Sequence, residues 1–314
     1  MTSLESWLAY IEELHPENIE LGLERVAQVH ARLPSAASTA KVLTVAGTNG
    51  KGSTVECLLQ CLLTQGVTVA AYTSPHLRQF NERIRINGRT ATDAAIVAAF
   101  AAVEAQRDGI ELTYFEFATL VAFEVFHTQQ VDVWILEVGM GGRLDAVNII
   151  DADIAIITSI GIDHCAWLGD TREEIAREKA GIMRIDAPVI CADPDPPAAI
   201  SECAVSAGSK LIQLGMDYHY STGAEHWLWE GQWEARAGLT LPGHAHLDNL
   251  AGALAALELL GWLPDVTTLN RVFDNWKLSG RLQVVPGAVE WWLDVAHNEG
   301  SVRALVRALT HNPE

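Results

Sequence analysis

Short apolar runs alternate along the chain with longer segments in which hydrophobic residues recur every three or four positions. Six runs have the length and the β-branched content of buried strands: 42–46, 67–72, 131–138, 154–158, 189–191 and 211–214. Six segments have helical spacing: 54–65, 92–106, 116–129, 172–183, 198–208 and 247–260. Continuous apolar strands separated by helices are typical of a parallel sheet covered on both faces. The pattern therefore predicts an α/β fold with a doubly wound, mostly parallel sheet.

Two stretches depart from this alternation. Between residues 215 and 243 polar and aromatic residues alternate with a period of two, which predicts a small antiparallel excursion. After a break at 278–286, a strand over 289–295 and a helix over 301–309 resemble the first βα unit of another domain. One such unit cannot bury its own apolar faces. We therefore expect one domain over 1–280 and an incomplete, C-terminally truncated domain over 281–314.

Composition and charge restrict the partners of the chain. Its 314 residues carry a formal net charge of −19, which argues against binding to the phosphate backbone of DNA or RNA. No apolar run reaches the length of about 18 residues that a membrane span needs, and the N-terminus lacks the basic start of a secretory signal. The five cysteines show no C-x-x-C spacing, which fits a reducing compartment. We expect a cytoplasmic protein without a nucleic-acid or membrane partner.

A glycine-rich segment, Gly-Thr-Asn-Gly-Lys-Gly-Ser, follows the first predicted strand and precedes an apolar helix. Glycines let backbone N–H groups approach an anion, and a helix N-terminus adds positive potential. Lys51 can meet the outer phosphates of a nucleotide, and a hydroxyl of Ser53 or Thr54 can reach Mg²⁺. The segment differs from G-x-x-x-x-G-K-[ST] by its shorter spacing and its extra glycine, and the alternative is a glycine turn with a solvated lysine. The context favours phosphate binding by eight residues: Gly47, Thr48, Asn49, Gly50, Lys51, Gly52, Ser53 and Thr54.

Polar residues also follow the second predicted strand. Ser74-Pro75-His76-Leu77 leads to an extended segment in which Arg83 and Arg85 are spaced to project on one side. Ligands of open parallel sheets collect at the carboxyl ends of the strands, and arginines placed there could hold a substrate carboxylate bidentately. The alternative is a solvated loop.

Two further strand ends carry candidate metal ligands. Glu137 ends an apolar strand, and because a buried unpaired carboxylate costs several kcal/mol, we expect a cation beside it. The candidate is Mg²⁺, with a buried salt bridge to Arg143 as the alternative. His164 follows the fourth strand and could bind metal or orient a phosphate, although a lone histidine is usually structural. Lys179 lies in a charged helical segment that composition alone assigns to a solvated face.

Taken in order, these motifs resemble one family. The chain contains, in this order, G-T-N-G-K-G-S, S-P-H-L with E-R-I-R-I, E-V-G-M-G-G-R-L-D-A-V-N, T-S-I-G-I-D-H, R-E-K-A-G-I, S-G-R-L-Q and L-D-V-A-H-N. The match runs from about residue 19 to residue 297. The ordered series resembles the bifunctional dihydrofolate synthase/folylpolyglutamate synthase family of the Mur ligase superfamily, and it is far more specific than any single motif. Ser279, Leu282 and Glu299 depart from it, because they stand where the family has a proline, an aromatic residue and a proline.

The resemblance implies a P-loop domain and a smaller Rossmann-like domain that close over ATP. It implies an ATP-dependent ligase that adds L-glutamate to dihydropteroate, forming dihydrofolate, and to reduced folates, forming polyglutamates. A carboxylate would first accept the γ-phosphate, and the amine of glutamate would then attack the acyl phosphate. We expect a monomer. The alternatives are another Mur-type amino-acid ligase and a catalytically inactive nucleotide-binding fragment.

The resemblance also assigns roles to residues of this chain. The catalytic residues would be Lys51, His164 and Lys179, the last of which matches the lysine that the family carbamylates. One or two Mg²⁺ ions would be held by Ser53, Ser74, Glu137 and His164. Besides the phosphate loop, ATP would contact Asn249, Arg281, Asp294 and His297. The folate substrates would contact Ser74, His76, Arg83, Thr113, Phe115, Asp145 and Ala146.

Overall fold

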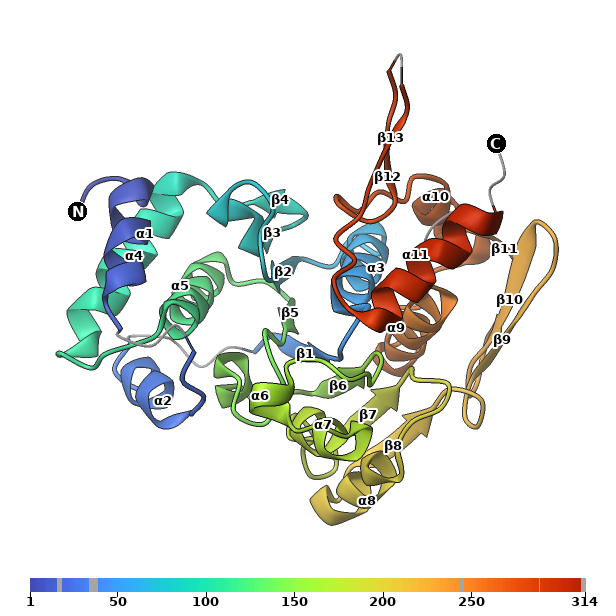
Figure 1. The fold of residues 1–314 in the computed structure, drawn as a ribbon, viewed down its shortest axis with the longest axis horizontal. Coiled ribbons are helices and arrows are strands. Elements are labelled where there is room, and N and C mark those ends of the chain that lie inside the picture. Colours follow the sequence, from blue (N-terminus) through green and yellow to red (C-terminus); the bar gives the residue numbers. More distant parts are fainter. Residues whose placement is uncertain (16–18, 34–38, 243–245, 288, 312–314) are drawn as a thin grey trace.

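The computed structural model describes residues 1–15, 19–33, 39–242, 246–287 and 289–311. At its centre lies an eight-stranded sheet with the order β4-β3-β2-β5-β1-β6-β7-β8 (Figure 1). Six of these strands run parallel to one another: β2 (Val69–Tyr72), β5 (Val133–Glu137), β1 (Lys41–Ala46), β6 (Ile154–Ile157), β7 (Pro188–Cys191) and β8 (Lys210–Gln213). They correspond to the six predicted strands and confirm the α/β class.

One edge of the sheet is antiparallel. β3 (Ile84–Ile86) pairs with β2, and β4 (Arg89–Thr90) pairs with β3. Asn87 and Gly88 connect the two strands with φ angles of 50° and 78°. Two successive residues with positive φ are typical of a two-residue hairpin turn, for which Asn-Gly is the favoured pair. The sequence analysis predicts only an extended segment here.

The six predicted helices are present: α3 (Lys51–Thr64), α4 (Asp93–Arg107), α5 (Tyr114–Gln129), α7 (Arg172–Ala180), α8 (Ala198–Ala207) and α9 (Leu247–Leu260). The sequence analysis does not delimit four others: α1 (Leu4–Glu13), α2 (Glu24–His30), α6 (Cys165–Leu168) and α10 (Val266–Asp274). Two short 3₁₀ helices complete this part of the chain: η1 (Phe80–Arg83) and η2 (Ala146–Ile149).

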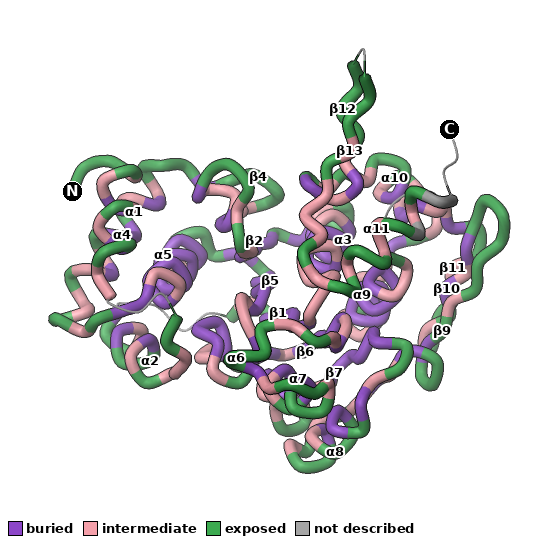
Figure 2. Tube along the Cα trace, viewed as in Figure 1, coloured by how far each residue is buried: buried purple, intermediate pink, exposed green. Residues whose placement is uncertain are grey.

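The helices cover both faces of the sheet because each strand sends alternate side chains to opposite sides. In β1, Leu43 and Val45 join the apolar cluster that contains α3, α9 and α10. Val42 and Ala46 join the other cluster, which contains α1, α2, α4, α5, α7 and α8. This double cover explains why the strands are apolar along their whole length, and Figure 2 shows the buried residues concentrated in these layers.

The predicted antiparallel excursion is confirmed. β9 (His219–Thr222), β10 (His226–Glu230) and β11 (Ala235–Thr240) form a three-stranded antiparallel sheet. Trp227 and Trp229 of β10 are buried in the cluster that contains α9. Residue 243, where the predicted excursion ends, lies outside the described residues.

After α10 the chain forms a hairpin and a helix. β12 (Gln283–Val285) pairs antiparallel with β13 (Trp291–Leu293), and α11 (Glu299–His311) follows. The strand predicted over 289–295 is therefore shorter than expected. Its partner, β12, lies in the segment over 278–286 that is predicted to be a break between elements. Figure 2 shows that the hairpin is mostly exposed. The domain boundary between 280 and 281 stays a prediction, and residues 312–314 lie outside the described part. Within the described residues, no helix combines the length and apolar character that crossing a membrane requires.

Candidate active site

The glycine-rich loop joins β1 to α3, and two of its positions accept only glycine. Gly47 and Gly50 have φ angles of 152° and 91°. A Cβ atom would lie 1.8 Å from Oγ1 of Thr158 at the first position and 2.2 Å from Oδ1 of Asn249 at the second. The Nζ atom of Lys51, the first residue of α3, donates to the Gly47 carbonyl at 2.8 Å. The loop therefore packs closely on β6 and α9 and holds its lysine inward.

A polar cavity of about 130 Å³ lies against this loop. It brings together residues from the ends of four strands, from α7 and from the C-terminal segment. The predicted site residues that line it are Gly47, Thr48, Asn49, Gly50, Lys51, Gly52, Ser74, Glu137, His164, Lys179, Arg281 and His297. These residues are spread over more than 200 positions of the sequence. Most of them meet because the carboxyl ends of parallel strands lie at one edge of the sheet.

Glu137 is the buried acid of this cavity. It is 5% exposed, its Oε2 atom accepts the backbone N–H of Ser74 at 3.1 Å, and burial raises its pKa, opposed by the charge of Lys51. The alternative salt bridge to Arg143 is wrong, because Nη2 of Arg143 lies 2.9 Å from Oε1 of Glu178 instead. In the described part of the chain no three His, Cys, Asp or Glu side chains gather into a metal cluster. Glu137, His164 and the Ser74 hydroxyl fit Mg²⁺, which usually takes one or two carboxylates and completes its shell with water and phosphate oxygens.

Lys179 is buried, so its assignment by composition to a solvated face is wrong. It is 3% exposed in the last turn of α7 and lines the polar cavity. Burial, aided by the charge of Lys51, lowers its pKa to about 7. A Cβ atom on Gly142 would lie 2.9 Å from the carbonyl oxygen of Lys179. The loop after β5 can therefore pack directly on this turn of α7.

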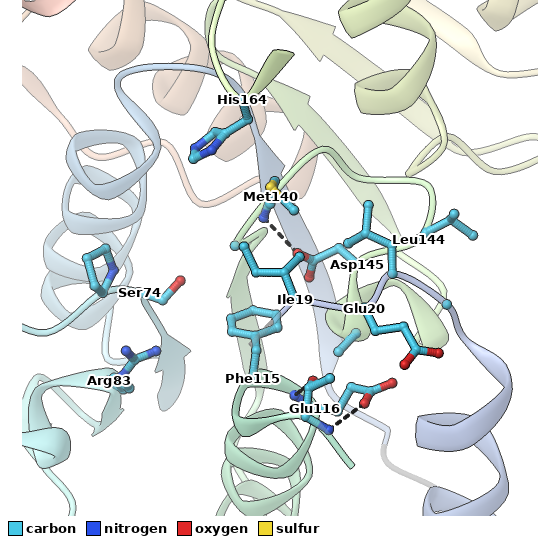
Figure 3. A pocket seen from close by; sticks show the side chains of 16 residues that line it. Ile19, Glu20, Ser74, Arg83, Phe115, Glu116, Met140, Leu144, Asp145 and His164 are labelled. Atoms are coloured by element: carbon cyan, nitrogen blue, oxygen red, sulfur yellow. Dashed lines mark hydrogen bonds between the residues drawn. The ribbon is translucent and has the colours of Figure 1, made fainter. Parts of the chain in front are cut away.

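An apolar cavity of about 260 Å³ adjoins the polar one (Figure 3). Its lining includes the predicted substrate residues Ser74, Arg83, Thr113, Phe115, Asp145 and Ala146. Ser74, Gly139, Met140 and His164 line both cavities. A molecule in the apolar cavity can therefore present a group to the phosphate loop.

Like Glu116, Asp145 is a buried acid that lines the apolar cavity. Burial raises its pKa to about 6, although its carboxylate accepts the N–H groups of Met140 at 2.8 Å and Val147 at 3.1 Å. A Cβ atom at Gly139 would lie 2.5 Å from Cζ of Phe115. The glycine lets the aromatic ring cover the end of β5.

Residues 45–257 match the family described as Mur ligase middle domain. The Escherichia coli dihydrofolate synthase/folylpolyglutamate synthase is 42% identical over 311 residues, which are 99% of this chain and 74% of that protein. This chain belongs to the dihydrofolate synthase/folylpolyglutamate synthase family.

Solved structures of the family share the fold. One is E. coli FolC in complex with DHPP and ADP, with a TM-score of 0.95 and 42% identity, covering 99% of this chain and 75% of that one. Another is a bifunctional folylpolyglutamate synthase/dihydrofolate synthase with Mn, AMPPNP and L-glutamate bound, with a TM-score of 0.91, 44% identity and the same coverage. The chain thus spans about three quarters of the length of these relatives.

A third cavity, of about 540 Å³, is also lined by residues of the phosphate loop, Asn49 and Gly50 among them. Ser53 lines it together with three residues that the family resemblance assigns to ATP: Asn249, Arg281 and Asp294. Ser53 is absent from the lining of the polar cavity that holds the other predicted metal ligands. Thr54 lines none of the three cavities, because it is buried and its hydroxyl donates to the backbone carbonyl of Asn249 at 3.5 Å.

The C-terminal segment reaches the phosphate loop through Asn298, for which the sequence predicts no role of its own. The side-chain amides of Asn49 and Asn298 exchange two hydrogen bonds of 3.0 and 3.1 Å. Asn298 also donates to Oδ2 of Asp163 at 2.8 Å. Burial raises the pKa of Asp163, but this bond and the N–H of His164 outweigh it, so the pKa is lowered. Asparagine carries no motif by itself, and only the fold pairs positions 249 residues apart.

The N-terminal segment forms a wall of the apolar cavity in this family member. Residues 19–22 line the cavity, and Arg25 of α2 joins them to α5 by contacting Glu20 and Glu116. Glu116 also accepts the N–H of Thr113 at 2.8 Å, which closes a capping box at the start of α5. The Thr-x-x-Glu spacing is a signal from which this helix start could have been read.

The two arginines after the second strand have different neighbours. Arg83 lines the apolar cavity, whereas Nη1 of Arg85 forms an ion pair of 2.6 Å with Glu56 of α3. The expected projection of both arginines on one side is therefore not seen. His76 is not among the residues that line the cavities, and its Nδ1 atom accepts a hydrogen bond from Nε of Arg83 at 2.8 Å.

Proposed function

We propose that this chain catalyses the ATP-dependent addition of L-glutamate to dihydropteroate and to reduced folates, as a cytoplasmic monomer. One observation carries the proposal: the polar cavity of the phosphate loop and the apolar cavity share a wall at Ser74, Gly139, Met140 and His164. Related structures that hold DHPP with ADP, or AMPPNP with Mn and L-glutamate, support the same use of the two cavities.

The reaction is the activation of an acid. A carboxylate does not react with an amine unaided at neutral pH, so the substrate carboxylate first displaces ADP from the γ-phosphate and becomes an acyl phosphate. The amine of glutamate then attacks the carbonyl carbon, phosphate leaves, and an amide remains. Enzymes catalyse phosphoryl transfer mainly by positioning the reactants and stabilising charge, rather than by forming covalent bonds to the substrate.

The chain supplies the charge that this reaction needs. The loop amides and Lys51 face the phosphate position, and Lys51 must exchange its bond to the Gly47 carbonyl for a phosphate oxygen. Mg²⁺, when bound, would neutralise phosphate charge, with Ser74, Glu137 and His164 of the polar cavity as its proposed ligands. Ser53, the fourth predicted ligand, lines the third cavity instead. From the C-terminal segment, Arg281 and His297 line the same cavity.

Lys179 is suited to carbamylation. Its pKa of about 7 leaves a large share of the amine neutral at neutral pH. A neutral amine adds to CO₂, forming a carbamate and releasing a proton, which would turn a buried cation into an anion beside the metal position. The charges of Lys51 and Arg281 near the cavity favour such an anion.

The apolar cavity is suited to a pterin. Its walls are mainly hydrophobic, Phe115 offers an aromatic ring, and Asp145 offers a carboxylate on the side opposite Arg83 (Figure 3). Thr113 and Ala146 complete the proposed contacts. An apolar cavity with few convergent polar groups is typical of a small-molecule site.

The test is ADP release by the 314-residue chain with Mg-ATP and L-glutamate, comparing dihydropteroate, tetrahydrofolate and no acceptor. We expect turnover with both acceptors and products heavier by one glutamyl residue in mass spectra. Turnover with neither acceptor, although Mg-ATP raises the thermal midpoint, would reject the ligase and favour a nucleotide-binding fragment. Turnover with tetrahydrofolate alone would reject the dihydrofolate synthase half of the proposal.

A further inference from the structure

Arg83 is a buried cation without an acid beside it. It is 8% exposed, and in the described part of the chain no carboxylate forms an ion pair with it. Its guanidinium carbon lies 5.9 Å from the centre of the Phe80 ring and 5.6 Å from that of Tyr114. Burying a charge costs several kcal/mol unless an opposite charge compensates it. The anion expected here must come from a ligand of the apolar cavity, which Arg83 lines.

A histidine ring orients this guanidinium. Nε of Arg83 always carries a hydrogen, and it donates to Nδ1 of His76 at 2.8 Å. Nδ1 must therefore be the acceptor, which places the ring hydrogen of neutral His76 on Nε2. The ring of His76 also packs edge-on against Phe80, with 6.1 Å between the ring centres.

This hydrogen bond decides which edge of Arg83 remains for a ligand. A guanidinium can meet a carboxylate with two parallel hydrogen bonds through either of two edges, one of which includes Nε. With Nε bound to His76, the edge formed by the two terminal nitrogens is left, and the protein group that interacts with Arg83 beside it is the neutral hydroxyl of Tyr72 rather than an anion. Figure 3 shows Arg83 on the same side of the cavity as Ser74, which lines both cavities. A carboxylate on this edge would lie toward the boundary with the phosphate loop.

We propose that His76 is a positioning residue that presents the terminal edge of Arg83 to the carboxylate of the pterin substrate. This inference rests on the proposed function, because it takes the occupant of the apolar cavity to be a pterin carboxylic acid. His76 then acts on the substrate through Arg83, although it lines no cavity itself.

Two substitutions of matched size separate hydrogen bonding from packing. His76→Asn places an oxygen acceptor near the position of Nδ1, whereas His76→Leu has a similar volume and no acceptor. The dissociation constants of dihydropteroate and of its neutral carboxamide are measured by fluorescence titration, and the KM values for dihydropteroate and ATP by ADP release. Each substitution is also made in an Arg83→Met background.

We expect His76→Leu to weaken binding of the acid about tenfold, as loss of a hydrogen bond to a charged group does, and to leave carboxamide binding and the KM for ATP unchanged. His76→Asn should stay within about twofold of wild type, and neither change should matter once Arg83 is methionine. If His76→Leu does not fold, as judged by its thermal midpoint, His76→Gln replaces it, because its acceptor reaches beyond the Nδ1 position.

Equal affinities of the Asn and Leu variants for the acid would overturn the inference, as would equal weakening of acid and carboxamide. A loss that persists in the Arg83→Met background would overturn it too. The titration does not depend on turnover, so a wild-type chain that binds the acid without releasing ADP would reject the proposed function and still test His76. A wild-type chain that binds acid and carboxamide equally would reject the inference alone.

Discussion

Replacing Lys179 by methionine should stabilise the protein near neutral pH, and the gain should shrink as the pH rises. Burial, aided by the charge of Lys51, lowers the pKa of Lys179 from 10.5 to about 7 in the folded chain. The unfolded chain keeps the ordinary value. The difference between the two pKa values corresponds to a folding penalty of about 4 kcal/mol at pH 7. Methionine has a similar length and no charge to desolvate.

The sign of the pH dependence follows from proton binding. Below pH 7 both states hold the proton, and the penalty is at its maximum. Between pH 7 and 10.5 the unfolded chain binds more protons than the folded chain, so the stability of the wild type rises with pH. From pH 7 to pH 9 the rise from this group is about 2 kcal/mol. The pKa of the Cys57 thiol is raised by a hydrogen bond with Cys61 and by burial, and that of the Cys191 thiol is raised by burial. Both thiols are present in both proteins, so their contributions cancel in the difference.

The assay is urea unfolding from pH 7 to pH 9 in CO₂-free buffer, so that Lys179 stays an amine. The exposed Lys277 provides a matched control. We expect the stability difference between Lys179→Met and wild type to fall by about 2 kcal/mol over this range, while Lys277→Met follows the wild type. Parallel profiles for wild type and Lys179→Met would refute the reasoning, because they would mean that the buried lysine does not lose its proton.

Three other substitutions test the phosphate-loop glycine, the ion pair of Arg85 and the contact of Asn298 with the loop. Gly50→Ala should lower the free energy of unfolding by about 1–3 kcal/mol, because Gly50 has a φ of 91° and its Cβ would clash with Asn249. Gly52→Ala is the control, since its Cβ would meet no atom within 4 Å, and it should lower the free energy of unfolding by less than half as much. Equal losses of the two variants in urea unfolding would contradict this prediction. Arg85→Met should lower the free energy of unfolding by about 3–5 kcal/mol, because it removes the ion-pair partner of the buried Glu56. Adding Glu56→Leu should restore most of that free energy. A double variant that is no more stable than Arg85→Met would argue against a buried ion pair. Asn298→Ala should raise the KM for ATP about fivefold and leave the KM for dihydropteroate unchanged; an equal rise in both would show a general loss of structure.

Much of the architecture follows from local sequence. The six parallel strands and their helices are set by apolar runs and helical spacing, which depend on neighbouring residues only. The phosphate loop is equally local, because its glycines, its lysine and the start of α3 lie within eight positions. The ordered motifs also identify the family, because several of them follow the ends of successive strands.

Other features depend on contacts between distant segments, and the sequence misjudges them. Asn87 and Gly88 turn an expected extended segment into an antiparallel edge, which requires β2 as a pairing partner. The last turn of α7 looks charged in sequence, and Lys179 becomes buried only when the loop after β5 packs against it.

The sequence by itself determined the α/β fold, the phosphate loop and the residues that can carry the chemistry, because these depend on pattern and residue type. Only the tertiary structure decided which groups share a cavity and how the surroundings of each group change its pKa. It separated Arg83 from Arg85, placed His76 against Arg83 and paired Asn49 with Asn298. It also shifted the pKa of Lys179, because desolvation depends on what surrounds a group in space.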